Sequence, residues 1–278
     1  MGARTRKILA QAALYAVLFL VGLVILLPFF WMLSTAFKPS PEIIRRPPTF
    51  LPVRPTLEHF THSFRRLPYF HNLWASLFVS SMSTVISIFF STMVGYGIAK
   101  FRCRGLNAVF ILILTGLMIP PFTIAIPLYI VAAQMGLVNS LWGVIIPFAI
   151  SNFGIFLMRQ YAVSVPDDLL AAARLDGASE LTILMKVVFP VVASGCAALG
   201  ILKFMLTWND FFWPLIMLSQ DKKKTLQVAL STLIDFEYYV DFGLVMACTI
   251  LIVVPMILIF VFFQKWIIEG IAITGMKG

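Results

Sequence analysis

Long apolar runs, separated by polar segments, limit what this chain can fold into. The first run, residues 8–32, contains Gln11 as its one strongly polar side chain. A helix of about 20 apolar residues crosses a bilayer, whereas a signal peptide has an apolar core of about 7–15 residues followed by a small-residue cleavage site. We expect an uncleaved membrane helix here, and an all-α, polytopic membrane protein overall. The six predicted transmembrane helices are residues 8–32, 74–99, 109–131, 137–157, 187–208 and 242–263.

Composition agrees with a membrane protein. Hydrophobic residues make up 60% of the chain and charged residues only 12%, against about 25% charged residues in a soluble domain. The net charge of +9 need not indicate nucleic acid, because the basic residues are scattered through the segments that would flank a membrane. We therefore expect contact with membrane lipid and not with nucleic acid.

The cysteines and histidines form no metal-binding pattern. No carboxylate or thiol cluster completes a site around the two histidines that lie three residues apart, so we interpret the histidines as surface residues. The cysteines have neither metal spacing nor a paired framework, and we expect them to act as small apolar side chains. These residues are Cys103, Cys196, Cys248, His59, His62 and His71.

Small residues recur on one face of the second predicted helix, at steps of four, three, four and four residues. Such a face lets two membrane helices approach closely, so it favours tight packing over a substrate pathway. These residues are Ser80, Thr84, Ser87, Ser91 and Gly95.

Helix-breaking and polar residues mark a candidate substrate pathway. Prolines in the third span free backbone carbonyls, so the helix is expected to break there, either to line the pathway or as a packed kink. Polar residues in the fourth span would face the bundle interior, where they contact a hydroxylated substrate or bond to another helix. Asn209 and Asp210, the polar residues that close the fifth span, are added to the candidates. The full set is Pro120, Pro121, Ser151, Asn152, Asn209 and Asp210.

The fifth span carries one charged side chain, Lys203, and ends in aromatic residues. We expect the long lysine stem to reach the headgroups, with a partner carboxylate in the bundle as the alternative. The closing sequence W-N-D-F-F-W-P, residues 208–214, is interpreted as an interfacial aromatic belt.

Residues 166–190 have the pattern of a helix, a turn and a second helix. Pro166 and the acids after it favour a helix start, because proline suits the first turn and acids face the positive end of the helix dipole. The pair Asp176-Gly177 predicts the helix end, since glycine adopts the left-handed conformation without a Cβ clash. A second helix is expected to begin at residues 178–180 and to run into the next apolar segment.

This segment resembles the cytoplasmic EAA loop of permease subunits of ATP-binding-cassette (ABC) importers, whose pattern is roughly E-A-A-x-x-D-G-A followed by L/F-P. The match comprises Ala172, Ala173, Asp176, Gly177, Ala178 and Phe189-Pro190. Ala171 departs from the pattern, because the family usually has glutamate there, and this makes the fit to an ATPase depend more on shape. The W-N-D-F-F-W-P sequence and the glycine-lysine-glycine tail also resemble the second permease of maltose-type sugar importers.

The resemblance implies a type I ABC importer permease fold. It also implies as partners a homologous permease in a heterodimer, two ATP-binding subunits and an extracytoplasmic solute-binding protein. The expected ATPase-coupling residues are Asp168, Ala171, Ala172, Ala173, Asp176, Gly177 and Ala178, and the expected tail contact with the ATPase is Met276, Lys277 and Gly278. The expected substrate is a carbohydrate or related polyol, with glycerol phosphate as the alternative because basic residues crowd the segment before the second span.

The resemblance also determines the expected orientation in the plasma or inner membrane. The positive-inside rule gives only eleven basic residues inside against nine outside, although residues 100–107 carry three and residues 133–140 none. A loop that meets a cytoplasmic ATPase places both termini in the cytoplasm. The expected regions are a cytoplasmic N-terminus (1–7), the first helix with an extracytoplasmic loop (8–72), a core of five helices (73–265) containing the coupling loop (159–186), and a cytoplasmic tail (266–278).

The chain lacks a phosphate-binding G-x-x-x-x-G-K-[ST] loop, a nucleophile–base pair and zinc spacing. We therefore expect no catalytic residue and no cofactor, with ATP hydrolysed by a partner subunit. Two rival classes are an ion-coupled secondary carrier and a membrane scaffold. Neither explains both motifs, and acidic residues at membrane depth, which ion-coupled carriers commonly use, are missing from the apolar runs.

Overall fold

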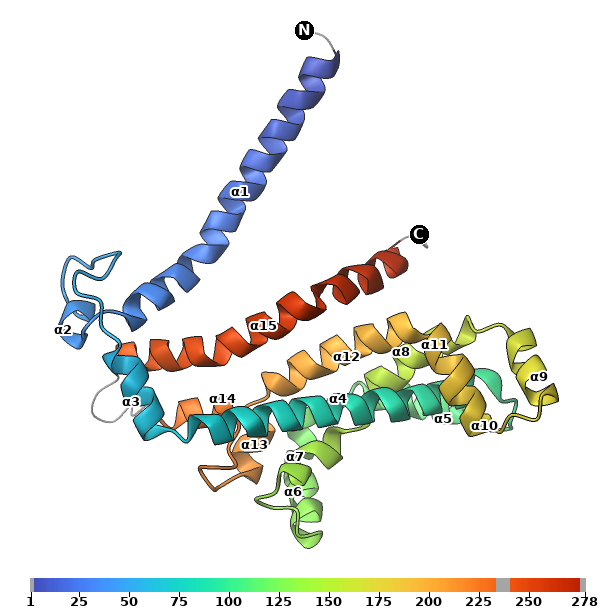
Figure 1. Cartoon of the computed structure of the whole chain (residues 1–278). Coiled ribbons are helices and arrows are strands. Elements are labelled where there is room, and N and C mark those ends of the chain that lie inside the picture. The colour runs from blue at the N-terminus through green and yellow to red at the C-terminus, as the bar shows by residue number, and fades with distance from the viewer. Residues whose placement is uncertain (1–2, 234–240, 276–278) are drawn as a thin grey trace. The chain divides into compact units, whose positions relative to one another are not determined.

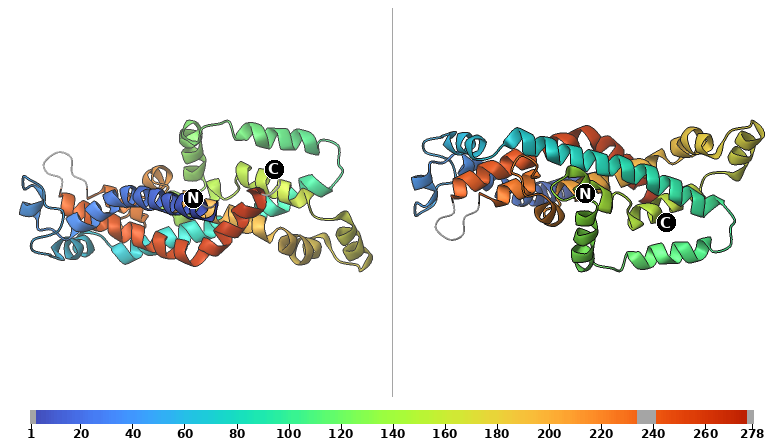
Figure 2. Two further views of the ribbon diagram at one scale, coloured as in Figure 1. Left: turned by 90° about the horizontal axis from the view of Figure 1, so that it is seen from above. Right: turned by 90° about the horizontal axis from the view of Figure 1, so that it is seen from below.

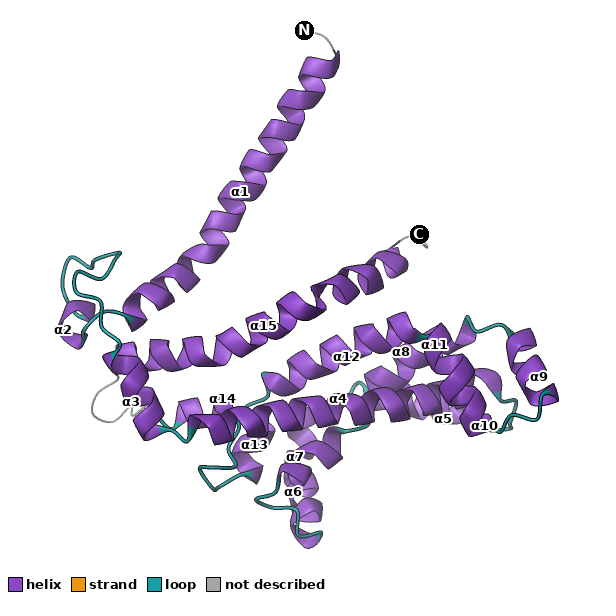
Figure 3. Ribbon diagram, in the orientation of Figure 1, coloured by secondary structure: helices purple, strands orange, loops and turns teal. Residues whose placement is uncertain are grey.

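The computed structural model describes residues 3–233 and 241–275, and within this part of the chain the regular elements are all helices (Figure 3). The chain divides into two units, which we describe separately. Unit 1 comprises Met1–Leu67 and Leu230–Pro255, and unit 2 comprises Pro68–Ala229 and Met256–Gly278.

Three helical regions can cross a membrane without a break: Gln11–Ala36, Tyr69–Lys100 and Phe242–Phe262. Three further pairs of helices pass the same length and hydropathy test together, but each pair is bent. Counted over the described residues, this gives up to six crossings, in agreement with the predicted number. The bent pairs are Leu106–Gly116 with Pro121–Gln134 (97°), Leu141–Phe148 with Asn152–Val163 (50°), and Glu180–Val191 with Ala193–Trp208 (83°).

Unit 1 contains the first helix and the segment that follows it. Helix α1 (Ala3–Ala36) is followed by α2 (Ser40–Ile43) and α3 (Glu58–Arg66), and the first turns of α15 (Phe242–Gly275) belong to the same unit (Figure 1). A small core of Ala36, Ala247 and Ile250 joins these elements. The segment between α2 and α3 is held by Glu42, whose carboxylate accepts hydrogen bonds from Thr49 Oγ1 (2.7 Å) and from the Val53 amide (3.0 Å).

The interpretation of the histidines as surface residues is wrong for His59, which is 2% exposed. Its Nε2 donates a hydrogen bond to the Lys38 carbonyl (2.8 Å), and its Nδ1 lies 3.7 Å from Asp241 Oδ1. A Cβ on Gly243 would collide with the imidazole ring, so the glycine makes room for it. The burial follows from partners that lie far away in the sequence.

Unit 2 is built around α4 (Tyr69–Lys100), against which α8 (Asn152–Val163) and α12 (Ala193–Trp208) pack. Helix α4 begins at Tyr69, five residues before the predicted start at Trp74, because Pro68 occupies its N-cap position. The predicted small-residue face is the packing face: Ser80, Ser87 and Ser91 are buried. A Cβ on Gly95 would lie 2.7 Å from the Arg159 backbone nitrogen, which confirms close helix approach at this face.

The third predicted span breaks where its prolines lie. Helix α5 (Leu106–Gly116) ends before Pro120, and the 3₁₀ helix η1 (Pro121–Ile124) leads into α6 (Ala125–Gln134). Figure 2 shows this segment looping away from α4 before the chain returns at α7 (Leu141–Ile145).

The fourth predicted span, 137–157, is displaced toward the C-terminus. It consists of α7, the 3₁₀ helix η2 (Ile146–Phe148) and α8, with the break at residues 149–151 after Pro147. The fifth consists of α10 (Glu180–Ile183), a π-helical turn (Leu184–Val188), α11 (Phe189–Val191) and α12. Two short helices, α13 (Phe212–Met217) and α14 (Leu226–Ser231), occupy part of the segment between the fifth and sixth predicted spans.

Candidate ATPase-coupling helix and membrane helix breaks

The residues predicted to couple the chain to an ATPase form helix α9 (Asp167–Leu175) and its C-terminal turn. Pro166 occupies the N-cap position, and Asp167 and Asp168 lie in the first turn, as predicted. Figures 1 and 2 show α9 at one end of unit 2, beyond the last turn of α4.

The turn after α9 is a Schellman motif centred on Gly177, with φ of +79°. The Ala178 amide donates to the Ala173 carbonyl (3.0 Å), and the Gly177 amide donates to the Arg174 carbonyl (3.0 Å). A Cβ at Gly177 would meet nothing within 4 Å, so the positive φ alone calls for glycine. Ser179 then caps α10 by accepting from the Thr182 amide (3.3 Å).

The residues predicted to couple differ in their exposure. Asp168, Ala171, Ala172, Asp176 and Gly177 are exposed. The helix is anchored by the opposite face, where Leu170 is 2% exposed and packs with Met158, Val165 and Ile183. Ala173 and Ala178 are partly buried against the same cluster.

The sequence reasoning missed Leu175, whose side chain is 89% exposed in the last turn of α9. It lies at i+3, i+4 and i+7 from Ala172, Ala171 and Asp168, so the four residues share one helix face. A single exposed apolar side chain is ordinary, but Leu175 joins the exposed Ala171 and Ala172 in one apolar face, and a contiguous exposed apolar face is typical of an interaction surface. Helical spacing is the signal that would have found it.

Ionic contacts hold the two ends of α9. The Lys100 ammonium donates to Asp167 Oδ1 (2.7 Å) and to the Val165 carbonyl (2.6 Å). The hydrogen bond and the positive charge of Lys100 lower the pKa of the Asp167 carboxyl below its ordinary value. At the other end, Arg174 Nε donates to Glu180 Oε1 (2.7 Å).

The six pathway candidates lie at three helix breaks in unit 2. Pro120 and Pro121 are exposed at the start of η1. Ser151 caps α8 by accepting from the Gly154 amide (3.2 Å), so this hydroxyl is engaged locally. Asn152 lies against Gly116, where a Cβ would collide with its amide. These contacts bring the third and fourth spans together beside their breaks.

Asn209 and Asp210 lie in the turn between α12 and α13. Asn209 Nδ2 donates to the Met205 carbonyl (2.9 Å), one turn earlier in α12, and Asp210 Oδ1 accepts from the Trp213 amide (3.5 Å). The next residues connect this turn to the other breaks. Phe212 makes an edge contact with Phe122 of η1 (ring centroids 4.8 Å apart).

The prediction that Lys203 reaches the headgroups is wrong, and the alternative of a partner carboxylate holds only in part. Asp210 lies close enough to interact electrostatically with the Lys203 ammonium, but the direct hydrogen-bond partner is a backbone carbonyl. The ammonium donates to the Phe148 carbonyl (2.7 Å), next to the break in the fourth span. A helix break leaves carbonyls without intrahelical partners, and a nearby donor satisfies one of them.

The interpretation of residues 208–214 as an interfacial belt is wrong for both tryptophans. Trp208 and Trp213 are each 2% exposed. Trp213 Nε1 donates to the Gly143 carbonyl (3.1 Å), and its ring makes an edge contact with Phe148 (5.4 Å between centroids). An indole with a buried N–H partner is satisfied in the interior and has no need of the headgroup layer.

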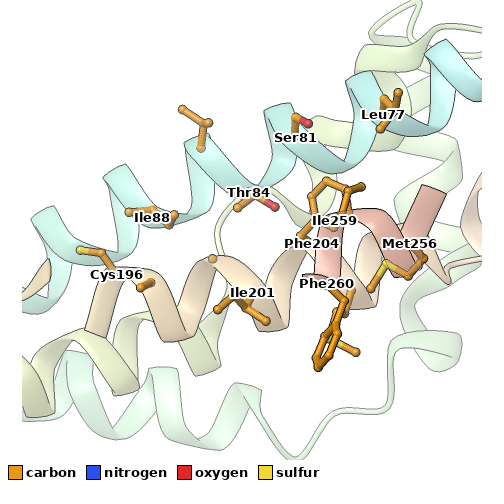
Figure 4. Close-up of a pocket in the computed structure, with 14 residues that line it drawn as sticks. Leu77, Ser81, Thr84, Ile88, Cys196, Ile201, Phe204, Met256, Ile259 and Phe260 are labelled. Atoms are coloured by element: carbon orange, nitrogen blue, oxygen red, sulfur yellow. The ribbon is translucent and has the colours of Figure 1, made fainter. Parts of the chain in front are cut away.

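A hollow of about 580 Å³ lies along α4, α12 and the part of α15 that belongs to unit 2 (Figure 4). Its hydroxyl groups come from Ser81 and Thr84, and the rest of its lining is apolar, with Ile88, Phe204 and Phe260 among the residues. Recognition of a polyol needs several placed polar groups. The hollow is therefore a poor carbohydrate site, and the pathway candidates lie elsewhere.

Two other expectations concern metals and the tail. Among the described residues, no group of three or more His, Cys, Asp or Glu side chains is placed to hold a metal ion. Met276, Lys277 and Gly278, the expected tail contact, lie outside the described residues.

The bent spans and the exposed α9 agree with the predicted membrane permease, and comparison with known proteins identifies the family. Residues 87–273 match the family described as "Binding-protein-dependent transport system inner membrane component". The chain belongs to this family. It is a membrane component of an ABC importer, which confirms the predicted class, and ATP hydrolysis falls to a separate subunit. The ion-coupled carrier and the scaffold are thereby ruled out.

Individual relatives cover nearly the whole chain. The arabinooligosaccharides transport system permease protein AraQ of Bacillus subtilis (strain 168) is 34% identical over 272 residues, which are 96% of each chain. The lactose transport system permease protein LacG of Rhizobium radiobacter is 32% identical, covering 95% of this chain and 96% of its own. A chain of a bacterial ABC transporter involved in the import of the acidic polysaccharide alginate has a similar structure, with a TM-score of 0.81 and 25% identity. That match covers 95% of this chain and 98% of the other.

The family also confirms the type I importer permease fold and the expected classes of partner. Its importers combine a permease heterodimer, ATPase subunits and a solute-binding protein. The predicted location is confirmed as far as the membrane is concerned: the chain is a multi-pass protein of the inner membrane.

Proposed function

We propose that this chain forms half of the translocation pathway for a carbohydrate and that α9 couples the pathway to an ATPase subunit. The observation that carries the coupling is the exposed, small-residue face of α9, made of Asp168, Ala171, Ala172 and Leu175. A face without large polar side chains can enter a groove on another protein, and its shape determines the fit. At Ala171 this face lacks the glutamate that is usual in the family, so Asp168 is the one acidic side chain on it.

In this proposal α9 transmits motion of the ATPase dimer to the membrane helices. Leu170 embeds α9 in the cluster that includes Met158 of α8 and Leu199 of α12. Displacement of α9 is therefore passed to packed helices, and these rotate between an inward-facing and an outward-facing arrangement. The turn at Gly177 connects α9 to α10, so a displacement of α9 also moves α10 and, beyond it, α12.

The orientation follows from the same proposal. If α9 meets a cytoplasmic ATPase, both termini are cytoplasmic, and the segment that Glu42 holds together lies outside. The proposed regions remain 1–7, 8–72, 73–265 with the coupling loop 159–186, and 266–278. Met276, Lys277 and Gly278 are proposed to contact the ATPase dimer.

We propose that the three helix breaks line the substrate pathway, with Pro120, Pro121, Ser151, Asn152, Asn209 and Asp210 as its polar and broken-backbone positions. Irregular backbone at membrane depth is tolerated where it is packed or faces a water-filled cavity. Asn209 and the two prolines are exposed within this chain, which supports their facing a partner or a solute.

The substrate class rests on the named relatives, two of which carry the names of oligosaccharide or disaccharide transport systems. The alternative, a glycerol phosphate, is supported by the exposed basic side chains of the segment before α4. These are Arg45, Arg46, Arg54, Arg65 and Arg66.

The test begins with a mild-detergent pull-down of the tagged chain from its native cells. We expect a second permease, an ATPase with a phosphate-binding loop and a solute-binding protein. Uptake by the reconstituted assembly is then measured with labelled lactose, arabinooligosaccharides and glycerol 3-phosphate. ATP-dependent uptake of a sugar supports the proposal. Uptake of glycerol 3-phosphate alone would overturn the carbohydrate assignment, and a chain that purifies without an ATPase would overturn the coupling.

A further inference from the structure

The Glu180 carboxylate joins the last turns of two helices. Its Oε2 accepts a hydrogen bond from the Tyr96 hydroxyl (3.0 Å) on α4, and its Oε1 accepts one from Arg174 Nε (2.7 Å) on α9. Glu180 itself is the first residue of α10. One carboxylate therefore connects α4, α9 and α10 at the end of unit 2 that carries the exposed face of α9.

A second contact ties the other end of α9 to the same turn of α4. Lys100 bonds to Asp167, the first residue of α9, and to the Val165 carbonyl in the connection from α8. Tyr96 and Lys100 are four residues apart, so they lie on one face of α4. The last turn of α4 thus holds the first turn of α9 through Lys100 and the last turn through Tyr96 and Glu180.

These contacts matter because α9 is too short to hold its own position. It has nine residues, fewer than an isolated helix needs in water, and Leu170 is its one fully buried side chain among them. Ion pairs as exposed as Arg174–Glu180, with side chains 44% and 45% exposed, add little to stability. Their geometric effect is larger, because they fix the direction in which a short helix points.

We propose that Tyr96, Lys100 and Glu180 are positioning residues that hold both ends of α9 against the end of α4. A displacement of α9 then moves α4 instead of being absorbed by the connecting turns. This inference rests on the proposed function, in which α9 meets the ATPase. It goes beyond that function by assigning the transfer of motion to specific side chains that are not among the predicted coupling residues, two of them at the end of α4.

The test measures solute transported per ATP hydrolysed in proteoliposomes that contain the complete importer. Glu180→Gln and Tyr96→Phe are expected to lower this ratio by about fivefold or more, the scale of a typical coupling between sites. ATP hydrolysis should continue. Tyr96→Phe removes one oxygen and keeps the ring that packs on Phe101 (5.7 Å between centroids), so it tests the contact even if Glu180→Gln assembles poorly.

Charge exchange separates positioning from a general structural role. Arg174→Glu and Glu180→Arg are each expected to uncouple the importer, and the double variant should restore most of the ratio because the ion pair re-forms. Asp167→Asn, which breaks the contact with Lys100, should also lower the ratio, and Asp221→Asn is its matched control, which should leave the ratio unchanged. The pair of Asp221 with Lys224 has the same length as Lys100–Asp167 (2.7 Å) and similar side-chain exposure, 77% and 16% against 79% and 9%, but it lies in a different segment.

Two outcomes distinguish this inference from the proposed function. Unchanged ratios in Tyr96→Phe and Glu180→Gln, or no rescue by the double variant, would overturn the positioning role. Leu175→Arg tests the proposed function separately, because it places a charge on the exposed face of α9 and should release the ATPase from the purified complex. An ATPase that remains bound to that variant would overturn the docking of α9, whatever the ratios are.

Discussion

The Lys100 ammonium lies 2.7 Å from the Asp167 carboxylate, although the two residues are 67 positions apart in the sequence. Lys100 ends α4, and Asp167 begins α9. The contact fixes the start of the exposed helix to the end of the longest helix in unit 2. Helix α9 is therefore attached to a membrane helix by a side-chain contact, which a free surface loop would lack.

The first prediction concerns the titration of Asp167. Its pKa is lowered because Lys100 bonds to the charged form, so the contribution of the pair is present above the ordinary Asp pKa of about 3.9. It is lost as the pH falls through the lowered value, so the pair should stay intact from neutral pH down to about pH 4. Lys100→Gln should raise the Asp167 pKa, measured by carboxyl carbon chemical shifts in nanodiscs. Identical titrations in both proteins would contradict the contact.

The second prediction concerns Gly177. A β-branched side chain at φ of +79° is strained by about 1–2 kcal/mol, so Gly177→Val should displace the turn and abolish uptake while the chain still inserts into the membrane. Gly177→Asn is the conservative variant, since asparagine tolerates the left-handed conformation, and it should retain much of the uptake. Normal uptake by Gly177→Val would remove the reason for treating this turn as part of the coupling.

The third prediction concerns the packing of α4 on α8. The Cβ of Gly95→Ala would lie 2.7 Å and 2.9 Å from backbone atoms of Arg159 and Met158, which cannot move as a side-chain tip does. We expect a loss of about 1–3 kcal/mol in stability, seen as a lower midpoint of thermal unfolding in detergent. Gly97→Ala is the control, because a Cβ there meets nothing within 4 Å. Equal midpoints for the two variants would refute the close approach.

The fourth prediction concerns Lys203. Lys203→Met keeps the stem but leaves the Phe148 carbonyl without its donor, which should cost about 1–3 kcal/mol of stability. The exposed Lys222→Met is the control, and its unfolding midpoint should match that of the wild type. If Lys203 only reached the headgroups, the two variants would behave alike.

The parts of this structure that could be predicted from the sequence are those set by neighbouring residues. Pro166, the two acids and Asp176-Gly177 determine α9 and its turn locally, and the prolines of the third span determine a local break. The small-residue face of α4 was also visible, because helical spacing alone places its members together.

The errors have a common physical cause. The sequence alone favours the surface or the headgroup layer for His59, Lys203 and Trp213, because each carries a polar atom. In the structure each polar atom has a backbone carbonyl as partner, from Lys38, Phe148 and Gly143 respectively. Those carbonyls lie 21, 55 and 70 residues away, and nothing in the local sequence indicates them.

The docking of α9 on an ATPase is the central claim, and site-directed cross-linking tests it most directly. Leu175→Cys would be introduced with the exposed Cys103 replaced by serine, and the thiol in the purified importer would be labelled with a short photoreactive reagent and illuminated during ATP turnover. We predict a covalent product that contains this chain and the ATPase subunit, and none when the cysteine replaces the buried Leu170. An intact, active importer in which Leu175→Cys never cross-links to the ATPase would contradict the account.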